Sequence, residues 1–173
     1  GTQAAQRLLH APRVAPGEAA LGDALDALGG EVIRFRSRDG LRLGGRWLPA
    51  EPGDTDWATD PHEAIIVLHG YSGSIAPDLV EYGPFLRRTA NVLGIDFRGH
   101  GGSDSGPSTF GMLEVEDVAG ALAWLGERGI HRVALFGTSM GGMAAIASVA
   151  ILGDGSLAAA DAEPDATRAD IDP

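Results

Sequence analysis

Ser139 lies at the centre of the segment GTSMG (residues 137–141), with one glycine two positions before it and another two positions after it. Four apolar residues, 133–136, precede the segment, and an alanine-rich stretch follows it. A serine in this pattern, between a strand and a helix, is typical of a tight turn that holds the hydroxyl above a sheet. Only very small residues fit at the two flanking positions, because a side chain there would collide with the turn. The chemistry that such a serine supports is nucleophilic attack on an acyl carbonyl, with a covalent acyl-serine intermediate.

Two other glycine-rich segments could complete such a site. They are HGYSG at residues 69–73 and RGHGGSD at residues 98–104, and each directly follows an apolar run. Attack on a carbonyl group places negative charge on its oxygen, which needs two preorganised N–H donors. We expect one donor to be the Met140 amide, in the first turn of the helix after Ser139. We expect the other to be the Tyr71 amide, in the turn after the apolar run that ends at residue 68.

The elements that must position these residues are predicted from apolar periodicity and turn residues. Strands are expected at residues 32–36, 41–48, 64–68, 91–97 and 133–136, and helices at 18–28, 77–90, 113–128 and 140–152. Asp39-Gly40 predicts a hairpin between the first two strands, and Pro84 interrupts the second helix. From residue 64 onward strands alternate with helices, which predicts an α/β fold: a mostly parallel sheet with helices on both faces and an N-terminal antiparallel hairpin. In the last helix the residues predicted to face inward are Met140, Ala144, Ala147 and Ile151.

The segments LHGYSG, DFRGHGGSD and GTSMGG, in this order and at these spacings, resemble the α/β-hydrolase fold superfamily, most closely its serine esterase and peptidase branches. The resemblance covers residues 31–152. It implies that Ser139 is the nucleophile and that the backbone N–H groups of Tyr71 and Met140 form an oxyanion hole. It also implies two elbow glycines, Gly137 and Gly141. The residues that it places in supporting loops are His69, Gly70, Asp96 and His100.

The resemblance is to the N-terminal half of that fold only. A complete member continues with an acid and then a histidine after the nucleophilic serine, whereas this sequence runs for one predicted helix beyond Ser139. We therefore expect a complementary C-terminal half of the same fold, on a separate chain or beyond a break near residues 153–173, to supply both residues. Alone, this chain is expected to be inactive.

Two histidines of this chain are alternative candidates for the general base. His69 and His100 both lie at the expected catalytic edge, and His69 is the nearer neighbour, since its strand should pair with the strand that precedes Ser139. The resemblance instead gives both of them a role in bracing loops, which is the interpretation that we favour. The other three histidines are interpreted as surface residues: His10, His62 and His131.

The chain is expected to have three parts. Residues 1–30 form an N-terminal extension with a short helix, residues 31–152 form the α/β core, and residues 153–173 form an acidic, flexible segment without apolar periodicity. The net charge of −11 arises mostly in residues 51–63 and 154–173, which we interpret as solvated surface. Nucleic acid is not an expected partner, because the sequence has no basic stripe.

The residue types that are absent exclude several kinds of site. Without cysteine the chain has no disulfide or thiolate metal site, and without lysine it has no Walker A phosphate loop or Schiff-base lysine. The histidines lack the spacing of a zinc site. Asp104 and Pro107 rule out a dinucleotide-binding loop at residues 99–102, since they replace a required glycine and block an immediate helix. No cofactor or metal is predicted.

The function predicted from these observations is that of a serine hydrolase, similar to carboxylesterases, acting on a small-molecule ester or other acyl substrate. A peptidase or an acyltransferase that uses the same serine, and a non-catalytic interaction module, are the alternatives. The apolar stretch nearest the serine segment, residues 143–152, is too short to cross a bilayer. The chain begins with glycine, which leaves an upstream membrane anchor, and with it the compartment, open.

Overall fold

The computed structural model describes residues 21–51, 60–71 and 73–153. The order of elements in these residues is α2 (Gly22–Ala27), β1 (Glu31–Arg36), β2 (Arg42–Leu48), β3 (Glu63–Leu68), α3 (Ala76–Leu86), β4 (Asn91–Ile95), α4 (Glu114–Gly126), β5 (Arg132–Gly137) and α5 (Met140–Leu152). Most of the expected N-terminal extension, most of the acidic loop and nearly all of the C-terminal acidic segment lie outside the described residues.

The five strands form one mixed sheet in the order β1-β2-β4-β3-β5. β1 and β2 pair as an antiparallel hairpin, and β2 also runs antiparallel to β4. β3 lies between β4 and β5 and is parallel to both, with Leu68 opposite Ile95 on one side and Gly137 on the other. The predicted fold class is therefore confirmed. The parallel register brings the carboxyl ends of three strands to one edge of the sheet, where ligands bind in this kind of sheet.

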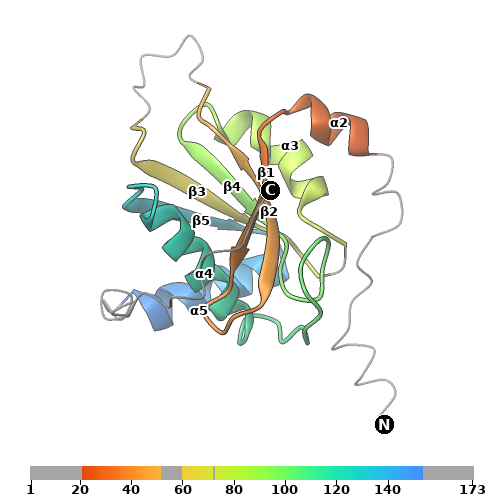
Figure 1. Ribbon diagram of the computed structural model, residues 1–173, viewed down its shortest axis with the longest axis vertical. Coiled ribbons are helices and arrows are strands. Elements are labelled where there is room, and N and C mark those ends of the chain that lie inside the picture. The colour runs from red at the N-terminus through yellow and green to blue at the C-terminus, as the bar shows by residue number, and fades with distance from the viewer. Residues whose placement is uncertain (1–20, 52–59, 72, 154–173) are drawn as a thin grey trace, which may run out of the picture.

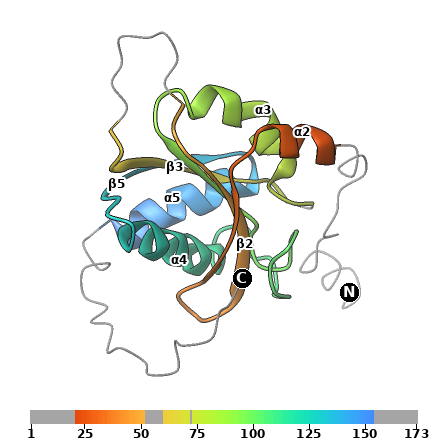
Figure 2. The same cartoon turned by 45° about the horizontal axis from the view of Figure 1, so that its top comes forward.

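Helices cover both faces of the sheet (Figures 1 and 2): α2 and α3 lie on one side, α4 and α5 on the other. Successive side chains of β3 point to opposite faces of the sheet, as in any strand, and so pack against the two helix layers in turn. Ile66 and Leu68 belong to a core shared with α4 and α5, whereas Val67 packs with Leu79 of α3. Since β3 is apolar on both faces, it suits a position inside the sheet, between β4 and β5 and under helices on both sides.

Two helices differ in detail from the prediction. α3 runs through Pro84 without the expected interruption and ends at Leu86 instead of residue 90. After Leu86 the chain forms a tight turn, in which the Arg88 and Thr89 N–H groups donate to carbonyls three residues back instead of four. In α5, the predicted inward position of Ile151 is wrong, since that side chain is 45% exposed. The buried stripe advances in steps of four through Met140, Ala144, Ser148 and Leu152. This helix is apolar on nearly every side, so apolar spacing alone does not identify its inward face.

Candidate active site

Ser139 occupies the turn that joins β5 to α5. β5 ends at Gly137 and α5 begins at Met140, so the chain reverses over two residues. Ser139 has φ 48° and ψ −113°, and its side chain is exposed. A positive φ is uncommon for a residue other than glycine, and such a conformation costs on the order of 1–3 kcal/mol. The turn therefore holds Ser139 in a strained backbone conformation at the carboxyl edge of the sheet.

The glycines at 137 and 141 are required by the same turn. A Cβ atom on Gly137 would lie 2.4 Å from the carbonyl carbon of Gly141, and a Cβ atom on Gly141 would lie 2.0 Å from the carbonyl oxygen of Leu68. Both contacts are with backbone atoms, which cannot turn aside as a side chain can. The close approach packs α5 directly against the end of β3 and leaves Ser139 at the tip.

The loop after β3 passes beside Ser139. A Cβ atom on Gly70 would lie 3.6 Å from the Cβ atom of Ser139, so the two backbones are neighbours. Thr138 donates its N–H to the Leu68 carbonyl at 3.1 Å, which ties the turn to the end of β3. Met140 is the first residue of α5, where N–H groups have no partner inside the helix. The structure thus brings Gly70 and Met140 to Ser139, and Tyr71 follows Gly70 in the same loop.

His69 braces this loop through both ring nitrogens. The Phe97 N–H donates to His69 Nε2 at 3.1 Å. Because Nε2 accepts that bond, the ring proton lies on Nδ1, which donates to the Gly70 carbonyl at 2.6 Å. The ring is 1% exposed. Both nitrogens are therefore engaged, which removes the lone pair that a general base at Ser139 would need.

His100 is buried behind the same loop. Its Nδ1 is 2.9 Å from the Arg98 carbonyl, and its ring lies edge-on to His69, with centroids 5.0 Å apart, and to Tyr71, at 6.0 Å. Tyr71 is also stacked on Phe110, with centroids 5.2 Å apart. The Tyr71 ring thus contacts a buried histidine and an exposed phenylalanine.

Asp96 joins the two glycine-rich loops. Its Oδ1 accepts the Ile75 N–H at 2.8 Å, and its Oδ2 accepts the Gly102 N–H at 2.9 Å. The approach is so close that a Cβ atom on Gly101 would lie 2.3 Å from the carboxyl carbon of Asp96. The carboxylate is turned toward these amides, and its contacts hold the loops that flank Ser139.

Glu114, at the start of α4, organises the loop that carries Phe110. Its Oε1 accepts the Thr109 N–H and its Oε2 accepts the Gly111 N–H, both at 2.8 Å, and the Thr109 hydroxyl donates to Oε2 at the same distance. Glu114 is fully buried. Phe110 itself has φ 54°, and it and Ser139 are the two residues other than glycine with positive φ in the described part of the chain. An acid in the first turn of a helix is common because it favours the helix dipole, so the local sequence does not reveal this role of Glu114.

Arg98 forms the largest buried charge network. Its guanidinium makes paired hydrogen bonds to Asp39 in the β1–β2 turn, at 2.9 Å each, and to Asp117 of α4, at 2.8 and 3.0 Å. Burial raises the pKa of Asp117 to about 6, and the hydrogen bonds from Arg98 oppose that rise. These contacts connect the hairpin, the loop after β4 and α4, although the sequence indicated neither acid as a partner of Arg98.

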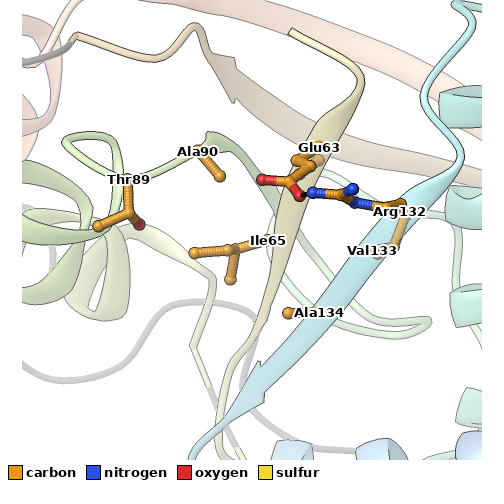
Figure 3. A pocket seen from close by; sticks show the side chains of 8 residues that line it. Glu63, Ile65, Thr89, Ala90, Arg132, Val133 and Ala134 are labelled. Atoms are coloured by element: carbon orange, nitrogen blue, oxygen red, sulfur yellow. Dashed lines mark ion pairs between the residues drawn. The ribbon is translucent and has the colours of Figure 1, made fainter. Parts of the chain in front are cut away.

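A shallow cavity of about 380 Å³ lies at the opposite end of the sheet (Figure 3). It is lined by the first residues of β3 and β5, including Ile65 and Ala134, and by Thr89 and Ala90. The ion pair between Glu63 and Arg132 crosses its rim. Because Ser139 follows the carboxyl end of β5, this cavity is separate from the candidate active site.

The described residues contain neither a membrane-spanning helix nor a cluster of metal ligands. None of the helices in residues 21–51, 60–71 and 73–153 has both the length and the apolar character to span a membrane. Over the same residues, no three histidine or carboxylate side chains gather in a way that could hold a metal ion.

Comparisons with known proteins extend these observations. The family model described as the alpha/beta hydrolase family matches residues 65–173. The uncharacterized protein YfhR of Escherichia coli strain K12 is 33% identical over 120 residues, which cover 68% of this chain and 40% of that protein. The uncharacterized protein Rv2307c of Mycobacterium tuberculosis is 31% identical over 148 residues, 82% of this chain and 47% of that protein. The chain therefore spans less than half the length of these curated relatives.

Two solved structures also resemble this chain in fold. The Pyrococcus furiosus esterase Pf2001 superposes with a TM-score of 0.62 and is 25% identical, over 84% of this chain and 54% of the esterase. XC6422 of Xanthomonas campestris, described as an a/b serine hydrolase without a lid, superposes with a TM-score of 0.57 at 23% identity, over 72% of this chain and 57% of that protein. The second likeness concerns the fold alone.

Proposed function

Because this chain belongs to the alpha/beta hydrolase family, we propose that it carries the nucleophile of a serine hydrolase that cleaves carboxylic esters. The observation that carries the proposal is the geometry of Ser139: an exposed serine at φ 48°, between two glycines that admit no Cβ atom. Strained backbone of this kind is concentrated at functional sites. The turn is then a nucleophile elbow, and the likeness to an esterase of 25% identity favours an ester substrate.

The proposed reaction has two steps. The Ser139 hydroxyl oxygen attacks the ester carbonyl carbon, and the carbonyl oxygen becomes an oxyanion that accepts hydrogen bonds from the Tyr71 and Met140 N–H groups. The C–O bond to the alcohol breaks, the alcohol leaves with the proton that a histidine took from Ser139, and the acyl group remains on the serine. Water, deprotonated by the same histidine, then attacks the acyl carbonyl. The bond to the Ser139 oxygen breaks, the carboxylic acid leaves, and the histidine returns the proton to the serine.

Three features of this chain support the first step. The N-terminus of α5, with its partial positive charge, lies directly behind Ser139 and favours the oxyanion. Gly70 lets the loop that carries Tyr71 come close to the nucleophile. His69, His100 and Asp96, which accepts the Ile75 N–H, hold that loop from the inside. A preorganised donor of this kind contributes a factor of roughly 10²–10³ to the rate.

We propose that the histidine and its acid come from a complementary half of the fold, outside this chain. Both ring nitrogens of His69 are engaged, and His100 is fully buried. β5 is at the edge of the described sheet, and the outer side of α5 exposes Met143, Ile146 and Val149. On the other face, the cavity of Figure 3 leaves Ile65 and Ala134 accessible. Further strands beside β5, with helices on each face, would cover all three surfaces.

Hydrolysis of p-nitrophenyl acetate by the complete gene product tests this function. We expect release of p-nitrophenol that Ser139→Ala abolishes and that Ser105→Ala, at an exposed serine of the loop after β4, leaves unchanged. Full activity of Ser139→Ala would refute the proposed nucleophile. Product analysis with added alcohols and peptides separates hydrolysis of esters from acyl transfer and from peptide cleavage, which could use the same serine. A folded gene product without any of these activities would support an interaction module instead.

A further inference from the structure

Thr138, the residue directly before Ser139, is held by an acidic side chain from a distant part of the sequence. Its hydroxyl donates to Oδ1 of Asp78 at 2.8 Å. Asp78 lies in the first turn of α3, 60 residues earlier in the chain. The hydrogen bond therefore connects the turn at Ser139 to the helix on the opposite face of the sheet from α5.

Thr138 also contacts the loop that carries the proposed oxyanion donor. A Cβ atom on Gly70 would lie 3.8 Å from both the carbonyl oxygen and the hydroxyl oxygen of Thr138. The Thr138 carbonyl accepts the Gly141 N–H at 2.8 Å, and its N–H donates to the Leu68 carbonyl. Thr138 thus touches β3, the Gly70 loop and the first turn of α5 through its backbone, while its hydroxyl bonds to Asp78.

The surroundings of Asp78 strengthen this hydrogen bond. Asp78 is half-buried, and its pKa is raised by burial and by the neighbouring Glu81, while the Thr138 hydrogen bond lowers it. A hydrogen bond to a partly desolvated carboxylate is stronger than one to a solvated group. A conformation as strained as that of Ser139 persists only where its surroundings hold it. Asp78 supplies such a restraint one residue away.

We propose that Asp78 is a positioning residue for the Ser139 nucleophile: through the Thr138 hydroxyl it fixes the strained turn against the Gly70–Tyr71 loop. The inference rests on the proposed function of Ser139. Asp78 contacts neither the hydroxyl of Ser139 nor any reacting atom in this scheme. Its loss should therefore lower the rate of attack by Ser139 more than it changes substrate binding.

The test compares variants of both partners in the complete gene product. Thr138→Val keeps the shape of the side chain and removes the hydroxyl, whereas Thr138→Ser keeps the hydroxyl. Asp78→Ala removes the acceptor, and Asp78→Asn keeps an acceptor oxygen. Glu81→Gln is the matched control, because it removes a charge from the same helix without touching Thr138. The readouts are the rate constant for labelling of Ser139 by a fluorophosphonate, and kcat and KM for p-nitrophenyl acetate.

We expect Thr138→Val and Asp78→Ala each to slow labelling and kcat about tenfold, the lower end of what a hydrogen bond to a charged group contributes, with KM changed less than twofold. The double variant should be no slower than the slower single variant, because both changes remove one bond. Thr138→Ser, Asp78→Asn and Glu81→Gln should stay within about threefold of the wild type.

The outcomes separate this inference from the proposed function. A folded wild-type protein that is not labelled refutes the function of Ser139 itself. Labelling of the wild type and of Thr138→Val at equal rates overturns only the role of Asp78. Additive losses in the double variant, or equal losses in Thr138→Ser and Thr138→Val, would also overturn it, since either result shows that the hydroxyl–carboxylate bond is not what positions Ser139.

Discussion

Alanine substitutions at the adjacent glycines Gly141 and Gly142 should have opposite effects. A Cβ atom on Gly141 would lie 2.0 Å from the Leu68 carbonyl oxygen and 2.5 Å from its carbon, both at the end of β3. A Cβ atom on Gly142 would find its nearest neighbour, the Gly137 carbonyl oxygen, at 3.4 Å, which is an ordinary contact. Comparing the same substitution at these two neighbouring positions of α5 therefore tests whether the turn depends on the close approach of Gly141 to the end of β3.

The expected magnitudes follow from these distances. A carbon atom rests no closer than about 3.3 Å from a carbonyl oxygen, so Gly141→Ala must push α5 away from β3 by about 1.3 Å. Forced overpacking usually costs about 1–3 kcal/mol, and this clash is with backbone atoms, so we expect a loss of at least about 3 kcal/mol in the free energy of unfolding. Gly142→Ala should raise the free energy of unfolding by up to about 1 kcal/mol, because alanine favours a helix more than glycine does.

Urea unfolding followed by tryptophan fluorescence measures both effects, since Trp124 is buried in the core against Trp47. The rate of fluorophosphonate labelling gives a second readout. We expect Gly141→Ala to lose labelling together with stability, while Gly142→Ala labels at the wild-type rate. A stable Gly141→Ala variant, or two variants that shift in the same direction, would refute the reasoning about the turn.

Three further predictions concern charged side chains, two of them buried and one partly exposed. Arg98→Met leaves the Asp117 carboxylate buried without its partner and should cost about 3–5 kcal/mol at pH 8. The pKa of Asp117 is already raised to about 6 by burial and rises further in the variant, so its folded state keeps a proton that the unfolded chain releases. The loss should therefore be smaller at pH 5 than at pH 8 in urea unfolding, and equal losses would contradict this. Glu114→Ala deprives several buried donors of their acceptor and should cost about 3 kcal/mol in the same assay, with a loss below 1 kcal/mol counting against the loop anchor. Glu116→Gln weakens a partly exposed ion pair with Arg38 and should cost less than about 1 kcal/mol in the free energy of unfolding, although this pair is as well aligned as the buried pair of Arg98 with Asp117. A larger loss would show that exposure to solvent does not weaken the pair.

The sequence was sufficient to predict the architecture because local signals agree with the fold. The apolar run at residues 64–68 predicted the strand β3, and Asp39-Gly40 predicted the hairpin that the antiparallel pairing of β1 and β2 confirms. The glycines around Ser139 predicted the tight turn, because the requirement for small residues arises within the turn itself and is visible in the local sequence. Helix ends and the inward face of α5 were less accurate, because Pro84 and an all-apolar helix give ambiguous local signals.

The acids that support the site were missed for a physical reason. Asp78, Glu114 and Asp117 each lie in the first turn of a helix, where an acid is common simply because it favours the helix dipole. Their actual partners are 60, up to 6 and 19 residues away in the sequence. No local pattern distinguishes an acid that only favours the helix dipole from one that turns inward to hold a loop, whether that loop is near or distant in the sequence. That distinction needed the tertiary structure.

The most direct test of Ser139 as the nucleophile is to locate the covalent adduct. The complete gene product is treated with a fluorophosphonate, digested, and mapped by mass spectrometry. The account predicts one adduct per chain, on the peptide that contains Ser139, and none in Ser139→Ala. A folded gene product that forms no adduct, or one whose adduct lies on another serine and persists in Ser139→Ala, would contradict it.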